Sequence, residues 1–459
     1  MKQLIILFTL LILFFGCTSN GNDNNNITNP PINGDINQVI INPPVASGLV
    51  GFSELDDSKL TIQALNDLIL ANNSFAVDYY NKLDSSKDQS GKNIFFSPFS
   101  ISTSLAMTYE GADGVTAEEM RKVLYFSEND TERRAAFANV YNNLNKSASK
   151  GNYTINIANA LWNEITYPFK QSFYDTIENY YYGKSTPVDF NNAPEEQRQK
   201  INLWVENQTN KKIIELLPKN SILEDTRMVL VNAIYFKGDW NNKFDEKNTY
   251  GGEFSVNENT KKDTQMMYQK NEFNYYEDDS FQYVELPYKG EDMSMIVLLP
   301  KENYVPCGAG TNDCVNPTNN VNYNFIIPSA SEITELKTKM STQKIEVHLP
   351  KFKFRTNYQM KKDLQEMGLK EAFTNFANFS KMDEQNYIKI DEIYHQAFVE
   401  VNEEGTEAAA ATAVVVIQKT SMPAPSPIFN ANHPFFFYIQ DNVSGEILFL
   451  GKIVDPTLE

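Results

Sequence analysis

A proline-free stretch of small residues and valines near the C-terminal end most constrains what this chain can fold into. Residues 406–420 contain no proline, whereas Pro423, Pro425 and Pro427 follow closely. Because proline lacks the backbone N–H that a sheet ladder needs, every residue of 406–420 could pair in a sheet, and pairing would stop beyond it. In an extended conformation one face of the stretch consists of Thr406, Ala408, Ala410, Thr412, Val414, Val416 and Gln418. The first four are small enough to slide over a packed core, so the stretch is able to become a central strand.

The same stretch is conformationally ambiguous. Glu407–Ala411 has strong helix propensity with Thr406 as a suitable cap, whereas Val414–Ile417 is β-branched and favours an extended chain. A short alanine-rich helix followed by an edge strand is therefore the alternative, and intrinsic propensity alone favours it.

Strand signals dominate the later part of the chain. Runs rich in β-branched or aromatic residues and bounded by turn residues lie at 153–162, 228–236, 293–299, 344–354, 434–439 and 446–454. Several, such as 229–236, are apolar on both faces, which predicts positions in the middle of a sheet that is covered on both sides.

Helix signals come earlier in the chain. Ser97 and Pro98 offer a cap and a first-turn proline for a helix that ends near Gly111, and Thr116 with Glu119 forms a capping-box pattern. Helices mainly first and strands mainly later predict an α+β fold in one large domain.

The N-terminal 16 residues have the pattern of a signal peptide. The apolar run at 4–15 is too short to span a bilayer. Gly16 before Cys17 resembles a bacterial lipobox, which implies that Cys17 becomes a lipidated N-terminus, although Phe14 stands where that motif usually has Leu. An ordinary secretory signal with an incidental cysteine is the alternative.

A low-complexity segment follows the leader. Residues 17–60 begin with a run rich in Asn, Gly, Pro, Ser and Thr, which predicts a flexible tether. We expect the folded domain at 61–459, with a Cys/Gly/Asn-rich insertion at about 303–328.

The two remaining cysteines, Cys307 and Cys314, lie in this insertion. In an exported protein the oxidising compartment favours a local disulfide that closes a surface loop. Zinc would need two further ligands, and the nearest histidine, His348, is far along the chain in a predicted strand. We therefore expect no metal site.

Composition excludes other classes of function. The chain carries 40 Lys+Arg against 59 Asp+Glu, a net charge of -19, which argues against nucleic acid as a partner. Motifs for a serine hydrolase, a paired-histidine metal site or a phosphate loop are absent from the sequence, and there are three histidines in all. An independent enzyme is poorly supported, and no cofactor is expected.

Blocks of sequence, in family order, resemble those of the serpins, a superfamily of serine and cysteine protease inhibitors. They are 93–101 (NIFFSPFSI), 230–240 (LVNAIYFKGDW), 348–352 (HLPKF), 433–437 (HPFFF) and 449–456 (FLGKIVDP). The hinge motif of inhibitory serpins is similar to Glu403, Glu404, Gly405, Thr406, Glu407, Ala408, Ala409, Ala410, Ala411 and Thr412. The resemblance implies a serpin fold with a large central mixed sheet, further sheets, and an exposed reactive loop at about 403–427.

The resemblance also implies a mechanism. A protease attacks the loop and forms an acyl-enzyme, and the cleaved loop then inserts into the central sheet and distorts the enzyme. Counting about fourteen residues on from Gly405 places the scissile bond between Lys419 and Thr420, which fits a trypsin-like target. Counting back from His433 places it near Met422 instead. Cleavage at Val415, Val416 or Met422 stays open, and with it elastase-like or cysteine proteases.

Two further groups of residues match mechanical positions of the family. Ser97, Ser100, Asn232 and His395 match the region where the sheet opens, and we expect His395 to be a buried, hydrogen-bonded core histidine. Lys351 and Glu403 match a salt bridge at the top of the opening, near Trp240.

These patterns predict a monomeric protease inhibitor that forms a covalent complex with its target and is attached by lipid to the bacterial cell envelope, at the outer membrane or cell surface. The alternative is a non-inhibitory serpin that serves as a surface-anchored binding protein. Relatives of that kind tend to carry bulky or charged hinge residues, whereas Thr406 and Ala408–Ala411 suit insertion.

Overall fold

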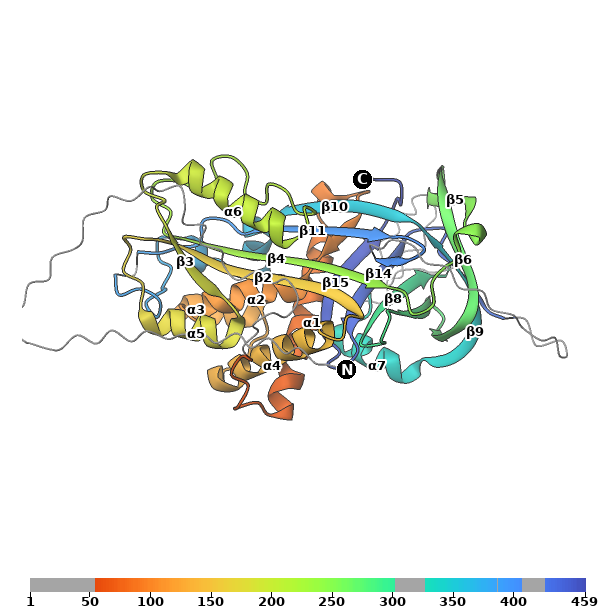
Figure 1. Cartoon of the computed structure of the whole chain (residues 1–459), viewed down its shortest axis with the longest axis horizontal. Helices are drawn as coiled ribbons and strands as arrows, with labels where there is room; N and C mark the ends of the chain where they lie inside the picture. The colour runs from red at the N-terminus through yellow and green to blue at the C-terminus, as the bar shows by residue number, and fades with distance from the viewer. Residues whose placement is uncertain (1–53, 302–326, 386, 407–425) are drawn as a thin grey trace, which may run out of the picture. The chain divides into compact units, whose positions relative to one another are not determined.

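The computed structural model describes residues 54–301, 327–385, 387–406 and 426–459, with only the backbone described at 156–159 and 232–233 (Figure 1). The described α-helices are α1 Ile62–Asp84, α2 Pro98–Tyr109, α3 Gly114–Val123, α4 Asp130–Ala148, α5 Gln171–Tyr181, α6 Pro194–Gln208, α7 Ala330–Lys339 and α8 Lys361–Met367. The described strands are β1 Ile94–Phe96, β2 Tyr153–Glu164, β3 Lys184–Val188, β4 Met228–Asp239, β5 Tyr250–Asn257, β6 Thr260–Glu277, β7 Phe281–Pro287, β8 Met293–Pro300, β9 Ser341–Pro350, β10 Phe352–Gln359, β11 Tyr394–Val401, β12 Gly405–Thr406, β13 Ile428–Asn430, β14 Phe435–Asp441 and β15 Ile447–Ile453.

One of the two predicted helix starts is correct. The Ser97 side chain accepts a hydrogen bond from the Ser100 N–H and Pro98 opens α2, as the sequence predicts. The capping box predicted at Thr116 is wrong, because α3 already begins at Gly114 after Asp113. The Thr116 hydroxyl instead accepts a hydrogen bond from the backbone N–H of Asn378 at 2.9 Å. The hydroxyl predicted to cap the helix therefore binds a segment that is distant in the sequence.

A six-stranded sheet runs in the order β10-β11-β12-β4-β2-β3. Its long strands β2 and β4 are antiparallel and paired from Tyr153 opposite Gly238 to Asn163 opposite Met228. In Figure 1 this sheet extends across the upper part of the body, and β4 lies between β2 and β11. The short strand β12 pairs with β11 on one side and with β4 on the other.

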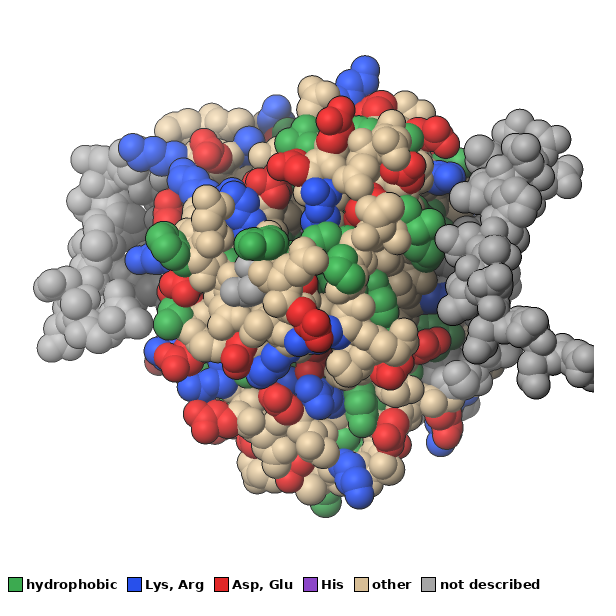
Figure 2. All heavy atoms as spheres, turned by 90° about the vertical axis from the view of Figure 1, so that its left-hand side faces the viewer, with side chains coloured by type: hydrophobic (Ala, Val, Ile, Leu, Met, Phe, Trp, Pro, Cys, Tyr) green, Lys and Arg blue, Asp and Glu red, His purple; other side chains and the backbone are tan. Residues whose placement is uncertain are grey.

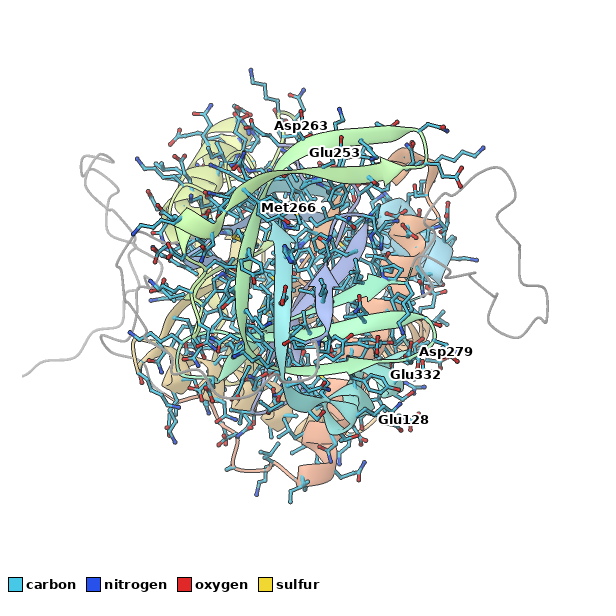
Figure 3. All side chains as sticks on the ribbon, turned by 90° about the vertical axis from the view of Figure 1, so that its right-hand side faces the viewer. Glu128, Glu253, Asp263, Met266, Asp279 and Glu332 are labelled. Atoms are coloured by element: carbon cyan, nitrogen blue, oxygen red, sulfur yellow. The ribbon has the colours of Figure 1, made fainter. Side chains whose placement is uncertain are left out.

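A nine-stranded sheet contains the order β1-β15-β14-β8-β7-β6-β9-β13, and β5 pairs with β6 outside that order. Figure 3 shows the end of this sheet, where Glu253 and Asp263 face each other across the β5–β6 hairpin and Met266 lies further along β6. β13 pairs with β9 in parallel, so the chain returns to this sheet after residue 425.

Five of the six predicted strands are confirmed as β2, β4, β8, β14 and β15. The sixth, predicted as one strand at 344–354, is two strands in different sheets. The chain leaves the nine-stranded sheet at Pro350 and joins the six-stranded sheet at Phe352. Lys351 lies at this crossing, where its N–H donates to the Gln265 carbonyl at 2.9 Å. The apolar pattern does mark the crossing, because the alternation changes phase there, from Ile345, Val347 and Leu349 to Phe352 and Phe354.

The two sheets and most helices share one large apolar cluster, which confirms the α+β fold. A smaller cluster lies where α6 covers β2 and β4, and there the Trp162 and Trp204 rings meet edge to face at 5.9 Å. On the other face, α2 packs against β4 and β15. The six-stranded sheet is thus covered on both faces, as the doubly apolar strand at 229–236 predicts.

The folded body includes residues before the boundary expected at residue 61. Leu55 is buried, its N–H donates to Asn142 Oδ1 at 2.9 Å, and Asn142 Nδ2 donates back to the Leu55 carbonyl at 3.0 Å. The segment at 54–60 is therefore fixed to α4. Within the described ranges, each helix is either too short or too polar to cross a bilayer.

Candidate functional site

The hinge enters the six-stranded sheet between β11 and β4. Thr406 is paired with Val401 of β11 and with Gly238 of β4, and Gly405 is paired with Asp239. Both pairings are antiparallel, because the chain reverses after β11 in a turn in which Asn402 and Gly405 exchange backbone hydrogen bonds of 3.0 and 3.3 Å. Gly405 and Thr406 therefore form a two-residue strand, β12, between β11 and β4.

Glycine is required where the hinge meets β4. A Cβ at Gly405 would collide with the Gly238 carbonyl oxygen and with Asp239 Cα. A Cβ at Gly238 would in turn press against the rings of Phe236 and Tyr288. The close approach of the two backbones depends on Gly405, whereas the lack of a side chain at Gly238 leaves room for the two rings.

Glu403 is held by three residues that lie far from it in the sequence. Lys351 Nζ lies 2.8 Å from its carboxylate, Thr249 Oγ1 donates to the other oxygen at 2.8 Å, and the Phe244 N–H donates to its carbonyl at 2.9 Å. Desolvation would raise the pKa of Glu403, but the hydrogen bonds from Lys351 and Thr249 outweigh it and hold the pKa below its ordinary value. The structure thus brings together the Lys351 and Glu403 pair that the family resemblance implies.

Glu404 is bound from β4 and the residues that follow it. Lys243 forms ion pairs with Glu404 and, at 3.3 Å, with Asp239, and the Trp240 N–H donates to the Glu404 carbonyl at 2.8 Å. The Trp240 indole N–H donates to the Asn402 carbonyl at 3.0 Å. Trp240 therefore holds both sides of the hinge turn.

An aromatic stack lies beneath the hinge. The Trp240 and Tyr288 rings stack at 4.7 Å with an interplanar angle of 11°, and Phe236 meets Tyr288 edge to face at 4.9 Å. The Tyr288 hydroxyl lies 2.7 Å from the Thr406 hydroxyl, and both side chains are buried. Thr406 consequently faces the core, not the solvent.

The register of β12 predicts where a longer inserted strand would run. Each step forward from Thr406 is one step back along β4, so Val416 would lie opposite Met228, the first residue of β4. Along β11, by the same rule, Ala413 would lie opposite Tyr394. Because side chains alternate, the residues that share the core-facing side with Thr406 would be Ala408, Ala410, Thr412, Val414 and Val416.

A cavity of about 320 Å³ lies at the far end of this path. It is bordered by Met228–Leu230 at the start of β4, by Tyr394 at the start of β11, and by Leu105 of α2. The lining mixes apolar side chains with polar and charged ones such as Asp225, Arg227 and Glu392. By the register above, the space borders the positions that residues 413–416 would take in an inserted strand.

The predicted sheet-opening residues lie partly together. The Ser97 N–H donates to His395 Nε2 at 3.0 Å, and the Ser97 hydroxyl donates to the Leu448 carbonyl at 2.6 Å. Burial lowers the pKa of His395 to about 3, so it is a neutral, hydrogen-bonded core residue as expected. Ser100 is buried beside them in α2, whereas the side chain of Asn232 lies outside the described residues.

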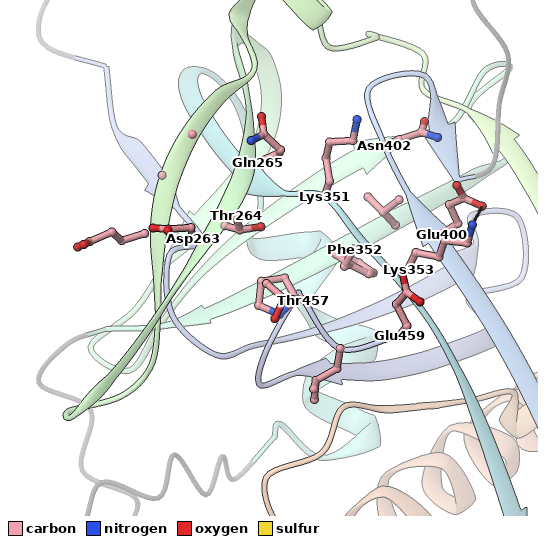
Figure 4. Close-up of a pocket in the computed structure, with 16 residues that line it drawn as sticks. Asp263, Thr264, Gln265, Lys351, Phe352, Lys353, Glu400, Asn402, Thr457 and Glu459 are labelled. Atoms are coloured by element: carbon pink, nitrogen blue, oxygen red, sulfur yellow. Dashed lines mark ion pairs between the residues drawn. The ribbon is translucent and has the colours of Figure 1, made fainter.

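A hollow of about 720 Å³ opens on the solvent side of the hinge (Figure 4). Lys351, Glu400 and Asn402 line it together with the C-terminal residues 456–459. Lys351 is thus accessible on one side while it contacts Glu403 on the other, and its side chain is 40% exposed.

Several predicted site residues lie outside the described ranges. These are the later hinge residues 407–412, the candidate scissile residues Val415, Val416, Lys419, Thr420 and Met422, and the three cysteines Cys17, Cys307 and Cys314.

Sequence reasoning missed Tyr288, Thr249, Lys243 and Phe244. None of them lies in a block that resembles the family, and each contacts the hinge from more than 150 residues away or, for Tyr288, from 118. One signal was available for Tyr288, because it follows directly on a strand-like run that ends at Pro287.

Comparison with known protein families gives one consistent match. A family model described as Serpin (serine protease inhibitor) matches residues 70–456. Human Serpin B4 is 41% identical over 407 residues, which cover 85% of this chain and 100% of the relative. The horse leukocyte elastase inhibitor is 38% identical over 395 residues, again 85% of this chain and 100% of the relative.

Solved structures share the same fold. Human thyroxine-binding globulin in complex with thyroxine superposes with a TM-score of 0.72 at 28% identity, covering 86% of this chain and 100% of that one. Relatives of this fold thus include a protein named for inhibition and one named for binding a small molecule.

Proposed function

The chain belongs to the serpin family, and on that premise we propose that it inhibits serine proteases as a suicide substrate. The loop at 407–425 would be attacked as a substrate, and the cleaved loop would enter the six-stranded sheet before the acyl-enzyme is hydrolysed. The alternative function is that of a non-inhibitory, surface-anchored binding protein.

The observation that carries the proposal is the position of Thr406 between β11 and β4. A strand that has begun in the middle of a covered sheet can be extended by further ladder pairs, provided that its core-facing residues fit. Those residues are small at Ala408, Ala410 and Thr412, and the first bulky ones, Val414 and Val416, would reach the cavity at the start of β4 and β11, where space is available. The sequence and the register therefore agree on insertion.

The free energy available is sufficient for the task. Extending the strand from Glu407 to Val416 adds ten residues beside β4, and the first seven of them, to Ala413, would also pair with β11. At about 1 kcal/mol net for each new hydrogen bond, the gain is on the order of 10 kcal/mol before any apolar burial is counted. A gain of this size is comparable to the whole stability of a typical domain, which is about 5–15 kcal/mol, so it could distort a protease.

Insertion would also move the enzyme across the body. Lys419 is thirteen residues beyond Thr406, so an extended chain would carry it roughly 43 Å at 3.3 Å per residue. The enzyme would arrive where β4 begins, at the pole shown in Figure 2. There Lys and Arg side chains lie among acidic and apolar ones, so this face presents no uniform charge to an arriving partner.

The target class follows from the residue before the scissile bond. Lysine at position 419 would fit a protease with a carboxylate in its specificity pocket, as trypsin-like enzymes have. Cleavage at Val415, Val416 or Met422 would extend the range to elastase-like or cysteine proteases.

The site of action is proposed from the N-terminal pattern. A leader that ends at Gly16, directly before Cys17, supports export and lipid attachment at Cys17. Residues 17–53 would then link the anchor to the folded body, which includes Leu55. An inhibitor held at the cell envelope would meet proteases in the surroundings of the cell.

The test is incubation of the protein with trypsin, followed by denaturing electrophoresis and thermal melts before and after loop cleavage. We expect a band at the summed mass that survives denaturant, and a large rise in melting temperature after cleavage. Human neutrophil elastase and papain serve as probes of the alternative bonds. Quantitative cleavage by every protease, with no covalent band and an unchanged melting temperature, would refute inhibition and leave the binding function.

A further inference from the structure

The bond between the Tyr288 and Thr406 hydroxyls joins the end of β7 to the hinge. It is 2.7 Å long and buried, and Tyr288 makes an isolated bridge with Trp240 directly beside it. No hydrogen bond of the Tyr288 hydroxyl to another side chain is found within the described residues. The bond therefore depends entirely on the hinge being in the sheet.

The Tyr288 ring has little freedom to move. Trp240 stacks on one face, Phe236 meets it edge to face, and Gly238 approaches so closely that a Cβ there would lie 2.8 Å from the ring. Its backbone is fixed as well, because the Tyr288 N–H donates to the Met293 carbonyl at 2.9 Å. The hydroxyl is thus presented at a fixed point between β11 and β4.

We propose that Tyr288 is a positioning residue for loop insertion: its hydroxyl holds Thr406 at the first ladder position, so that the inserted strand is nucleated before the loop is cut. The proposal rests on the proposed inhibitory function and adds a determinant of how often a cleaved loop traps its enzyme.

The physical reason is the difficulty of the first step. Starting a strand orders a turn and two residues with few bonds in return, whereas each later residue adds pairs to a ladder that already exists. A hinge that is already paired avoids this step during the short life of the acyl-enzyme. The bond between the two hydroxyls also makes it unfavourable for the hinge to leave the sheet, because the buried Tyr288 oxygen would then lose its hydrogen-bond partner.

Tyr288→Phe is therefore expected to change how the acyl-enzyme partitions between trapping by the inserted loop and release by hydrolysis. Loss of one net hydrogen bond shifts the hinge toward its expelled state by on the order of two- to tenfold. The number of inhibitor molecules consumed per trapped enzyme should rise by a similar factor. The rate at which trypsin attacks the loop should stay the same or increase, since an expelled hinge makes the loop more accessible.

Thr406→Val tests the same bond from the other side and leaves the aromatic stack untouched. Thr406→Ser retains the hydroxyl and should behave as the unmodified protein. Combined with Tyr288→Phe, Thr406→Val should add little, because the two changes remove the same bond. Tyr438→Phe is the matched control: it deletes another buried tyrosine hydroxyl, in β14, for which the described residues offer no hydrogen-bond partner.

The experiment has two readouts on the full-length protein. Hydrogen–deuterium exchange of peptides that cover 398–406 reports whether the hinge is in the sheet and needs no protease. Titration against trypsin reports the stoichiometry of inhibition. We expect faster hinge exchange and a higher stoichiometry for Tyr288→Phe and Thr406→Val, and neither change for Thr406→Ser or Tyr438→Phe.

The two proposals fail in different ways. If hinge exchange responds as expected while no variant forms a covalent complex with any protease, the role of the Tyr288–Thr406 bond in holding the hinge is supported and the inhibitory function is refuted. If the unmodified protein traps trypsin but Tyr288→Phe and Thr406→Val match it in exchange and in stoichiometry, the positioning role of Tyr288 is refuted.

Discussion

Replacing Thr406 by Arg should convert the inhibitor into a substrate while the fold is kept. Thr406 is 3% exposed and faces Tyr288 in the core, so an inserted arginine would place its guanidinium in the apolar layer beneath the sheet. The hinge can avoid this by leaving the sheet, which sacrifices the two-residue strand β12 and little else. We therefore expect a melting temperature close to that of the unmodified protein.

The magnitude follows from the burial of the charge. An unpaired buried charge costs several kcal/mol, and about 4 kcal/mol corresponds to a factor of about a thousand in an equilibrium or rate. An insertion that begins about a thousand times more slowly should lose to hydrolysis of the acyl-enzyme in nearly every turnover. Trypsin would then cleave the loop quantitatively and remain active.

The assay is titration of trypsin with the Thr406→Arg protein, read as residual activity and as covalent complex on a denaturing gel. Glu407→Arg is the matched control, because residue 407 would face away from the core and already carries a charge. It should keep the stoichiometry within about twofold, as is usual for surface substitutions. A covalent complex formed as efficiently by Thr406→Arg as by Glu407→Arg would refute the reasoning from alternation and burial.

Four further outcomes are expected. Gly405→Ala should expel the hinge from the sheet, because the added Cβ would collide with the β4 backbone. Faster hydrogen–deuterium exchange at 398–406 would detect this, and unchanged exchange would contradict the requirement for glycine. Glu403→Gln should speed that exchange at neutral pH. The contribution of the unmodified Lys351–Glu403 pair should be lost as the pH falls from the ordinary carboxyl pKa through the lowered pKa of Glu403, so hinge protection that does not decline in acid would oppose the role of this pair. Burial, with Asp441 nearby, raises the pKa of Glu446 well above its ordinary value. Because the unfolded chain releases this proton at lower pH than the folded protein does, the stability of the fold should decline as the pH rises. Glu446→Gln should therefore raise the melting temperature at pH 8 but not at pH 4. Lys419→Leu should abolish trapping of trypsin, and persistence of the trypsin complex would move the scissile bond away from Lys419.

The fold class and most strands of this protein could be predicted from local pattern. The doubly apolar run at 229–236 becomes β4 in the middle of a covered sheet, and Ser97 with Pro98 begins α2 as predicted. Such features depend on neighbours within a few residues, so the sequence carries them directly. The crossing at Lys351 also has a local signal, a change of phase in the apolar alternation, but two strands separated by a single residue are easily taken for one.

By itself, the sequence determined that the stretch after Gly405 could enter a sheet: it lacks proline, and its alternate residues are small enough to pass over a core. Only the tertiary structure decided how far the entry has gone and what holds it. Thr406 meets Tyr288 across 118 residues of chain, and Glu403 meets Thr249 across 154. Contacts of that separation depend on how whole sheets pack together, because a hydroxyl or carboxylate acquires its partner only when the strands that carry the two groups come to lie side by side.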